Sequence, residues 1–237
     1  MDTYGKLYLI PTRLGDNPPL EVLPISIKKT IEDIDNYIVE NEKTARRFIK
    51  RVTPSKSQPS LKIKVLNKYT SIEERNTFLN PCHTGISVGL LSEAGCPAIA
   101  DPGADIVRLA HEMNIRVVPL VGPSSITLAL MASGMNGQNF AFNGYLPIDK
   151  AERKSKLKSL ERISSEQNQT QIFIETPYRN NKLLEDMIAI LQPNTKVCVA
   201  CDITLPTEYI RTMSAKEWKN KKEDLHKRPA IFILKKD

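Results

Sequence analysis

Ser92 to Gly103 is the segment of this chain whose residue types are best suited to binding a ligand. It reads Ser-Glu-Ala-Gly-Cys-Pro-Ala-Ile-Ala-Asp-Pro-Gly. Gly95 and Gly103 lack a Cβ, so a ligand can approach the backbone closely. Backbone N–H groups in such a turn suit a carboxylate, and a fixed carboxyl group suits hydroxyls. Asp101 can alternatively serve only as the cap of a helix.

The flanking residues place this segment between a strand and a helix. An apolar run from Ile86 to Leu91 precedes it, and apolar residues at helical spacing follow it, namely Ile106, Val107, Leu109, Ala110 and Met113. A loop at the carboxyl end of a strand is where open α/β sheets bind ligands. We therefore predict a ligand-binding loop at 92–103.

Further turns of this kind follow other predicted strands. They read Pro-Thr-Arg-Leu-Gly-Asp from Pro11, Pro-Leu-Val-Gly-Pro-Ser-Ser from Pro119, Phe-Asn-Gly-Tyr-Leu-Pro from Phe142 and Glu-Thr-Pro-Tyr-Arg from Glu175. Each turn alone is weak evidence, because proline and glycine are common in turns. The usual G-x-G-x-x-G and G-x-x-x-x-G-K-[ST] nucleotide motifs are missing from the sequence, and Gly122-Pro-Ser-Ser does not match the G-x-S-x-G elbow of hydrolases.

Strand-like and helix-like segments alternate, which is typical of βαβ units in a parallel sheet covered on both faces. In the first half we predict strands at 6–10, 62–66, 86–91 and 115–120, and helices at 30–37, 43–51 and 104–113. In the second half we predict helices at 123–133, 150–162 and 179–191, and strands at 140–144, 171–175, 195–201 and 230–234. The proline-rich turn at 119–123 predicts a hinge between two domains, residues 1–120 and 121–237.

Cys198 and Cys201 match the C-x-x-C spelling, but we predict that they are packed thiols. The segment from Thr195 reads as a strand, and residues three apart on a strand point to opposite faces. A zinc site would need two more ligands, and none of the three histidines forms a paired motif with a cysteine. We expect no metal site.

Basic residues are unevenly distributed in this chain of net charge +7. Lys43 to Lys64 holds eight basic residues and no acidic one, and Lys150 to Arg162 holds six basic and two acidic residues. Such runs are typical of a solvated surface or of a surface that binds a phosphate-rich partner such as RNA. Both interpretations stay open at this point.

The sequence predicts a cytoplasmic protein without membrane contact. Its apolar runs are all much shorter than the roughly 20 residues that span a bilayer. The first residues, Met1 to Gly5, lead directly into a strand-like run without a signal-like core.

In their order and spacing, the turns resemble those of the tetrapyrrole methylase superfamily of S-adenosylmethionine (SAM)-dependent methyltransferases. The resemblance covers nearly the whole chain and is strongest from Ile86 to Arg179. Within the superfamily, the chain is most similar to the ribosomal RNA small-subunit methyltransferase I branch, which methylates a cytidine ribose 2′-hydroxyl. The resemblance implies two α/β domains, the first with a mainly parallel sheet and the second with a mixed sheet. It also implies a homodimer and SAM in a cleft between the domains.

The same resemblance implies which residues contact SAM. They lie in the turn after the first strand, in the central loop, in the interdomain turn and beside two later strands. They are Pro11, Gly15, Asp16, Ser92, Glu93, Ala94, Cys96, Ser124, Ser125, Ile174 and Ala230.

The acceptor side departs from the RNA branch. The Glu-Asp-Thr-Arg of that branch corresponds here to Glu40-Asn-Glu-Lys43, its His-Asn-Glu is absent near Asn67, and its Glu-Leu-Thr-Lys becomes Asp202-Ile-Thr-Leu205. A general base for the acceptor hydroxyl would assist methyl transfer. The candidate catalytic residues are Glu40, Asp101 and Glu175, and the candidate acceptor-binding residues are Asn41, Lys43, Arg46, Arg47 and Arg179.

Three functions are consistent with these patterns. The basic segment 43–64 favours a methyltransferase that acts on a ribose hydroxyl of ribosomal RNA. The altered acceptor motifs favour the same chemistry on a small molecule, such as a tetrapyrrole, or on a protein side chain. A third possibility is an RNA-binding relative that has lost catalysis and binds RNA without turnover.

Overall fold

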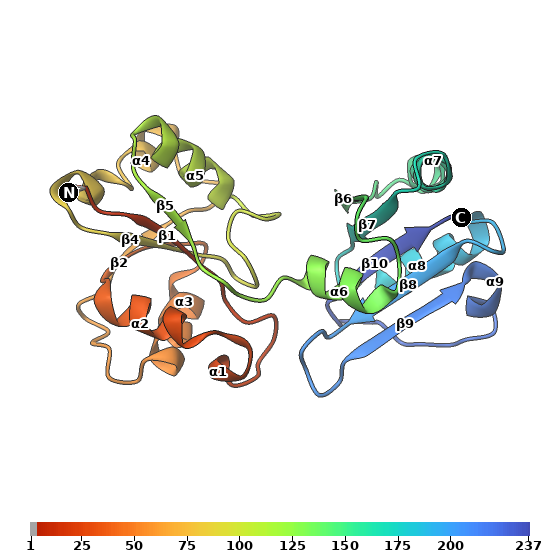
Figure 1. Cartoon of the computed structure of the whole chain (residues 1–237), viewed down its shortest axis with the longest axis horizontal. Helices are drawn as coiled ribbons and strands as arrows, with labels where there is room; N and C mark the ends of the chain where they lie inside the picture. Colours follow the sequence, from red (N-terminus) through yellow and green to blue (C-terminus); the bar gives the residue numbers. More distant parts are fainter. Residues whose placement is uncertain (1–3) are drawn as a thin grey trace. The chain divides into compact units, whose positions relative to one another are not determined.

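A computed structural model describes residues 4–237 of the chain. The chain forms two compact units, of which the first ends at Ser124 and the second begins at Ser125 (Figure 1).

The first unit contains a five-stranded sheet in which every strand pairing is parallel. The strand order is β3-β2-β4-β1-β5. The strands are β1 Leu7–Ile10, β2 Asn36–Val39, β3 Lys62–Val65, β4 Val88–Leu91 and β5 Val117–Pro119. Leu91 pairs with Ile10 on one side and with Val39 on the other, so the carboxyl ends of β1, β2 and β4 are level. The turns after these three strands therefore emerge side by side at one edge of the sheet.

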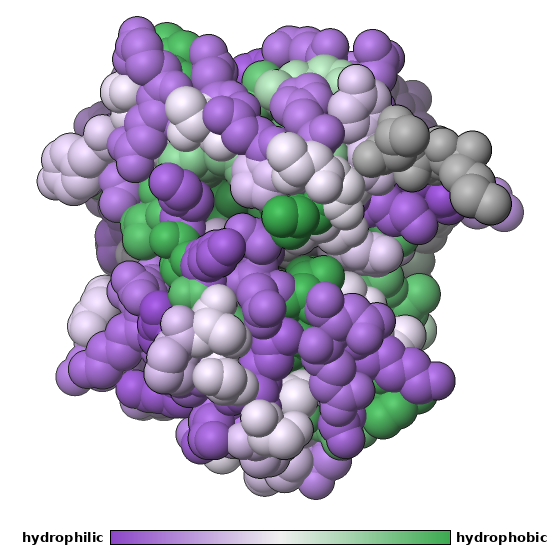
Figure 2. Space-filling model, turned by 90° about the vertical axis from the view of Figure 1, so that its left-hand side faces the viewer, coloured by the Kyte–Doolittle hydropathy of each residue, from purple (hydrophilic) through white to green (hydrophobic). Residues whose placement is uncertain are grey.

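Helices cover both faces of this sheet (Figure 1). They are α1 Pro19–Val22, α2 Ile25–Asp33, α3 Glu42–Val52, α4 Ile72–Asn76, the short 3-10 helix η1 Asn80–Thr84 and α5 Gly103–Glu112. One buried cluster joins Ile31 of α2 and Ile49 of α3 to Ile10, and a second joins Ile106 of α5 to Leu90. Two-sided burial explains why β4 is apolar and buried along its whole length. On the face of this unit shown in Figure 2, hydrophilic side chains predominate.

The predicted helix at 30–37 is wrong in its second half. The helix is α2, which ends at Asp33, and residues 36–39 form β2 inside the sheet. Ile31, Ile34 and Ile38 are spaced as on one helix face, which hid the change from helix to strand. The backbone changes from helical to extended at Ile34, where φ is −118° and ψ is 146°.

The second unit contains a mixed sheet with the strand order β6-β7-β10-β8-β9. The β6–β7 pairing is parallel and the other pairings are antiparallel. The strands are β6 Phe140–Tyr145, β7 Thr170–Ile174, β8 Lys196–Cys201, β9 Tyr209–Ser214 and β10 Ala230–Lys235, and the helices are α6 Ser125–Ser133, α7 Lys150–Glu166, α8 Asn180–Ile190 and α9 Ala215–Trp218. The core is centred on Trp218 and on Phe173 and Phe232, whose stacked rings have centroids 6.2 Å apart. The sequence did not predict β9, a half-buried edge strand.

The structure confirms that Cys198 and Cys201 lie on a strand with their side chains on opposite faces. Cys201 belongs to the same buried cluster as Val197 and Val199, whereas Cys198 alternates with them along β8. Both thiols are free. Within residues 4–237, His, Cys, Asp and Glu side chains form no group of three or more that could hold a metal ion. In the same part of the chain no helix has the length and apolar character needed to cross a membrane.

Burial should make most thiols of the native protein unreactive. It raises the pKa of Cys82 and of Cys201 to about 11 and also raises the pKa of Cys198. Since the thiolate is the reactive form, a thiol reagent at pH 8 is expected to modify at most Cys96 in the folded protein and all four cysteines after unfolding. Rapid labelling of two or more thiols without denaturant would contradict this packing.

Candidate functional site

Three predicted site residues follow the aligned carboxyl ends of strands β1, β2 and β4 in the first sheet. Pro11 follows β1, Glu40 follows β2 and Ser92 follows β4. Hydrogen bonds join the first and last of these turns. The Thr12 N–H donates to the Gly95 carbonyl at 2.9 Å, the Thr12 hydroxyl donates to the Ser92 carbonyl at 3.2 Å, and the Ser92 hydroxyl donates to the Gly95 carbonyl at 2.8 Å. The turn after β1 and the 92–103 loop are thus one bonded structure.

Two glycines allow the neighbouring turns to pack closely. Gly95 has a φ of +75°, which is left-handed and favours glycine. A Cβ on Gly122, in the turn after β5, would lie 2.2 Å from the Pro11 Cβ. The Cys96 sulfur lies 3.4 Å from the Pro123 carbonyl oxygen, and burial raises the pKa of its thiol. Pro11 and Cys96, both predicted SAM contacts, therefore also hold the loops together.

The structure brings the carboxyl groups of Glu40, Glu93 and Asp101 into one neighbourhood. The Glu93 N–H donates to the Glu40 Oε1 at 3.3 Å, and the Thr44 hydroxyl donates to the Glu93 Oε1 at 2.7 Å. Glu40 and Asp101 line the same small hollow above β2 and β4. Burial raises the pKa of Glu40, and the charges of Asp101 and Glu93 raise it further, against the opposing effect of the Glu93 N–H. A carboxyl group with a raised pKa is a candidate proton acceptor.

Asp101 bonds the start of α5, as its sequence position also allowed, from the residue before the N-cap Pro102. Its Oδ1 accepts hydrogen bonds from the N–H groups of Gly103, at 2.7 Å, and Ala98, at 2.9 Å. Gly103 begins α5, and Ala98 has a left-handed φ of 66°. Asp101 therefore stabilises both the helix start and a strained turn, although burial raises its pKa.

Loss of this cap should lower stability measurably. Replacing Asp101 with alanine is expected to reduce the free energy of unfolding by about 0.5–2 kcal/mol, the usual cost of removing a helix cap. Replacement with asparagine keeps an acceptor oxygen and should cost less. Urea denaturation of both variants measures the difference, and equal stability of the alanine variant and the wild type would contradict the capping role.

The predicted acceptor-binding residues on α3 differ in their surroundings. The Asn41 side chain caps α3 by accepting from the N–H groups of Lys43 and Thr44. Arg46 forms an ion pair with Glu42 at 2.7 Å and donates to the Gln58 carbonyl at 2.7 Å. Within residues 4–237, the side chains of Lys43 and Arg47 form no ion pair or hydrogen bond. Asn41 and Arg46 thus have structural partners, whereas Lys43 and Arg47 are available to a ligand.

A cavity of about 200 Å³ lies between the turn after β1, the turn after β4 and α3. Its walls include the predicted residues Gly15, Ser92, Glu93, Ala94 and Arg47, together with Thr12, Arg13 and Thr44. Sequence reasoning missed these last three. Their sequence positions could have indicated them. Thr44 lies one helical turn after Asn41, and Thr12 and Arg13 lie inside the turn from Pro11 that was already predicted to contact SAM.

Asp16 lies beside this cavity as an exposed ion-pair partner of two arginines. Its Oδ1 lies 2.9 Å from the Arg13 Nη2 and also contacts Arg51. Hydrogen bonds from Arg51 and Arg13 hold the pKa of Asp16 below its usual value. The side chain of Asp16 therefore already has partners within the protein.

The remaining predicted residues belong to the hinge and the second unit. Ser124 ends the first unit and Ser125 begins α6. Ile174 ends β7 and pairs with Ile231, the neighbour of Ala230. Ile174 and Ala230 therefore lie at the same end of the neighbouring strands β7 and β10. The structure thus brings this pair together in space although the two residues are far apart in sequence.

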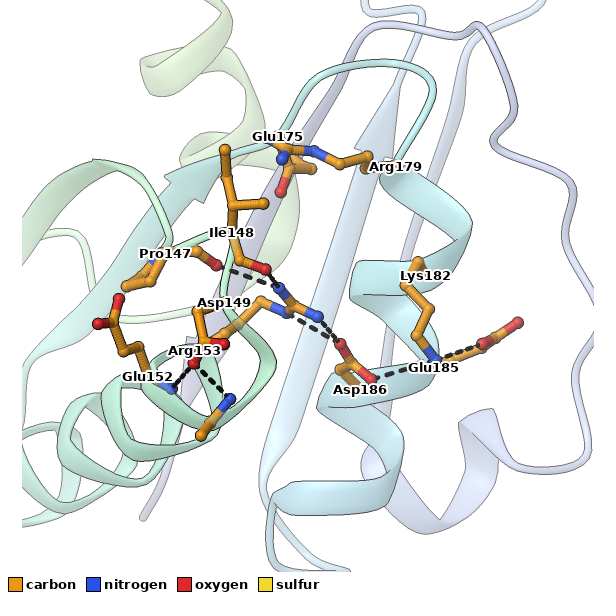
Figure 3. A network of polar contacts seen from close by, with 11 residues as sticks. Pro147, Ile148, Asp149, Glu152, Arg153, Glu175, Arg179, Lys182, Glu185 and Asp186 are labelled. Carbon is orange, nitrogen blue, oxygen red and sulfur yellow. Dashed lines mark hydrogen bonds and ion pairs between the residues drawn. The ribbon is translucent and has the colours of Figure 1, made fainter.

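Glu175 and Arg179 form one ion pair at that edge (Figure 3). The Glu175 Oε1 accepts from the Arg179 Nη2 at 2.6 Å and Nε at 3.1 Å, and from the Thr176 N–H at 2.7 Å. The Glu175 side chain is 3% exposed. Glu175 is therefore a buried carboxyl group that already has protein donors.

Arg153 is buried, although the sequence placed it in a basic surface run. Its Nε and Nη2 donate to the Asp186 Oδ2 at 2.9 Å and 2.5 Å (Figure 3). Its Nη1 donates to the carbonyl groups of Pro147 and Ile148. Arg153 therefore joins α7 and α8 to the turn that follows β6.

The fold is shared with solved structures of methyltransferases. The structure matches that of a cobalamin biosynthetic enzyme, cobalt precorrin-4 methyltransferase CbiF, with a TM-score of 0.61, 17% identity and coverage of 97% of this chain and 94% of that one. It matches the methyltransferase CobJ with a TM-score of 0.64, 12% identity and coverage of 98% and 94%. At these identities the likeness establishes the fold.

The family follows from the sequence. The model for tetrapyrrole (corrin/porphyrin) methylases matches residues 24–219, and the chain belongs to this family. It is 30% identical over 220 residues to the ribosomal RNA small subunit methyltransferase I of Haemophilus influenzae, covering 92% of this chain and 74% of that protein. The proteins of the same name from Vibrio cholerae and Escherichia coli O157:H7 are 29% and 27% identical, over 89% and 98% of this chain and 69% and 78% of theirs.

These comparisons confirm the predicted fold class, the predicted family and a SAM-dependent methyltransferase as the kind of enzyme.

Proposed function

We propose that this protein transfers the methyl group of SAM to a ribose 2′-hydroxyl of small-subunit ribosomal RNA. The observation that carries the proposal is the position of Glu40. This half-buried carboxyl group with a raised pKa lies at the start of basic α3 and is bonded to the predicted SAM loop through the Glu93 N–H. The names of the similar proteins agree with this acceptor.

The residues of the first unit fit SAM chemically. Within residues 4–237, the backbone N–H groups of Gly15 and Ala94 have no acceptor, and both residues line the cavity. Such groups suit the amino acid carboxylate of SAM. Glu93, oriented by Thr44, suits a hydroxyl or ammonium group. Pro11, Asp16, Ser92 and Cys96 support these loops. We propose that four further residues contact SAM, namely Ser124, Ser125, Ile174 and Ala230.

Bound SAM supplies a methyl group on a sulfonium centre for an in-line displacement. The chain positions the acceptor oxygen and removes its proton, and positioning alone can lower a barrier by about 7–11 kcal/mol in favourable cases. We assign the proton to the Glu40 carboxylate, because it accepts one long hydrogen bond, from the Glu93 N–H, whereas each of the other two candidates accepts several short ones. Asp101 caps α5 and Glu175 is paired with Arg179, so each is proposed to shape the acceptor side. Lys43, Arg47 and Arg179 supply positive charge for RNA.

We further propose that the enzyme acts as a cytoplasmic homodimer. The family resemblance supports this assembly. Light scattering on the purified full chain tests it, since a mass near that of one 26.7 kDa chain at micromolar concentration would contradict a stable dimer.

Methyl transfer from labelled SAM tests the function directly. Small ribosomal subunits from cells that lack this protein should accept label, and subunits from cells that contain it should accept little because their site is already modified. Alkaline hydrolysis of the labelled RNA should leave a resistant dinucleotide, which a 2′-O-methyl group causes and a base methyl group does not. Transfer to tetrapyrroles or proteins but not to RNA would favour the small-molecule or protein acceptor. RNA binding without transfer would favour a protein that has lost catalysis.

A further inference from the structure

Two arginines, Arg13 and Arg47, line the cavity of about 200 Å³ at the carboxyl ends of the first sheet, and Glu93, which accepts from the Thr44 hydroxyl, is the one acidic residue among its lining residues in the described part of the chain. Pockets for drug-sized ligands have roughly 300–1,000 Å³, so this cavity suits a smaller group. An arginine fork matches the oxygens of a phosphate. The cavity therefore has the chemistry of an anion site.

Arg13 is held in place and keeps part of its charge. Its side chain is 12% exposed, its Nη2 lies 2.9 Å from the Asp16 Oδ1, and its Nη1 donates to the Asn17 carbonyl. Asp16 is shared with Arg51, so the three side chains together carry one net positive charge. A fixed, incompletely neutralised guanidinium favours an anion at the cavity.

Arg47 differs from its neighbour Arg46. The guanidinium of Arg46 is bound to Glu42 and to the Gln58 carbonyl. Arg47 is exposed, and in the part of the chain from residue 4 to 237 its side chain forms no ion pair or hydrogen bond. Of the two adjacent arginines, Arg47 can therefore bind a ligand without first losing a partner.

The basic residues of α3 form a row that reaches this cavity. Lys43, Arg47 and Arg51 are four residues apart and so lie along one side of the helix. They extend over roughly 12 Å at 1.5 Å per residue. Arg51 meets Arg13 through their shared Asp16. A row of this length suits successive phosphates of a chain better than the single carboxylate of SAM.

We propose that Arg13 and Arg47 bind one backbone phosphate of single-stranded RNA next to the acceptor nucleotide, and that Lys43 and Arg51 continue this contact along α3. The inference rests on the proposed RNA acceptor. It assigns the Arg13 and Arg47 side of the cavity to the phosphate and leaves the Gly15 and Ala94 N–H groups to the carboxylate of SAM. It separates Arg47, which contacts RNA, from Arg46, which supports the helix and the following loop.

The salt dependence of RNA binding tests this assignment. Binding of a short fluorescent single-stranded RNA is measured by anisotropy at several salt concentrations for the wild type, Arg47→Ala, Arg47→Lys and Arg13→Ala. The control Arg162→Ala removes one exposed charge from α7, far along the chain from the cavity. SAM affinity is measured by calorimetry on the same proteins, and thermal unfolding reports whether each variant is folded.

For Arg47→Ala we expect roughly tenfold weaker RNA binding at low salt. The slope of log K against log salt should fall in magnitude by about 0.7, the value for one lost contact with a single strand. SAM affinity should stay as in the wild type, Arg47→Lys should recover the slope but only part of the affinity, and Arg162→Ala should resemble the wild type.

Weaker SAM binding with an unchanged RNA slope would overturn the proposal and assign the cavity to the cofactor. An Arg47→Ala slope equal to that of the wild type in a folded protein would also overturn it. Failure of the proposed function looks different, because RNA would then bind with the expected slopes while no methyl group is transferred.

Discussion

Replacing Glu40 with glutamine is expected to lower kcat for methyl transfer by about 10²–10⁴-fold, the usual contribution of a positioned general base. Glutamine keeps an oxygen that can accept the Glu93 N–H but cannot take the acceptor proton. SAM affinity should therefore change little. Single-turnover transfer from labelled SAM measures the effect. The neighbouring Glu42→Gln is the control, because Glu42 is exposed and its one ion pair within residues 4–237 is with Arg46.

The same variant should show the opposite effect on stability. Burial raises the pKa of Glu40, so the folded protein holds this proton more tightly than the unfolded chain does. Its ionisation therefore destabilises the folded state as pH rises through the interval above the ordinary glutamate value, and the loss is complete above the folded pKa. At pH 7 the glutamine variant should be at least as stable as the wild type, and below about pH 4 the difference should vanish.

The activity of the wild type should depend on pH in the same sense. Transfer should fall as pH is lowered through the raised pKa of Glu40, at a higher pH than an ordinary glutamate would give. Full kcat in the glutamine variant, or a large loss of stability at pH 7, would contradict the assignment of Glu40 as a buried base.

Replacing Asp186 with alanine is expected to lower the free energy of unfolding by about 3–5 kcal/mol. The change leaves the buried Arg153 guanidinium without its carboxylate, and an uncompensated buried charge has a cost of this size. The side chains of Asp186 and Arg153 are 7% and 10% exposed, so solvent screens the pair little. Guanidinium denaturation followed by fluorescence of the single Trp218 measures the change.

Two further variants distinguish a lost charge partner from a general defect in α8. Glu185→Ala removes the adjacent, exposed carboxylate that pairs with Lys182, and should cost less than about 0.5 kcal/mol. The double variant Arg153→Met with Asp186→Leu removes both charges and should recover most of the stability. If Asp186→Ala cost no more than Glu185→Ala, the buried pair would not hold the second unit together.

Arg153 also fixes the turn after β6, so loss of its carboxylate partner should loosen that turn. Its Nη1 donates to the carbonyl groups of Pro147 and Ile148 (Figure 3). Hydrogen exchange of Asp186→Ala under native conditions should therefore show faster exchange around residues 147–149 than in the wild type.

The sequence by itself predicted the turns after β1 and β4 and the strands that precede them, but not β2, which precedes Glu40. The apolar run at 86–91 and the proline and glycine pattern at 92–103 predicted a ligand loop after a strand, and β4 with its loop confirms the placement. The strand assignment of Cys198 and Cys201 was also decided locally, because alternation on a strand has a period of two residues.

Only the tertiary structure decided which of several chemically equivalent side chains have hydrogen-bond or ion-pair partners and which are available to a ligand. Arg46 and Arg47 are identical neighbours in sequence, but among the described residues 4–237 only Arg46 has side-chain partners, namely Glu42 and the Gln58 carbonyl. Arg153 resembles the surface lysines around it until Asp186, 33 residues away, buries it in an ion pair. The spacing of Ile31, Ile34 and Ile38 fitted a helix, yet pairing with β3 and β4 made residues 36–39 a strand. Local periodicity reports the shape that a segment can take, whereas partners distant in sequence decide burial, charge and pairing.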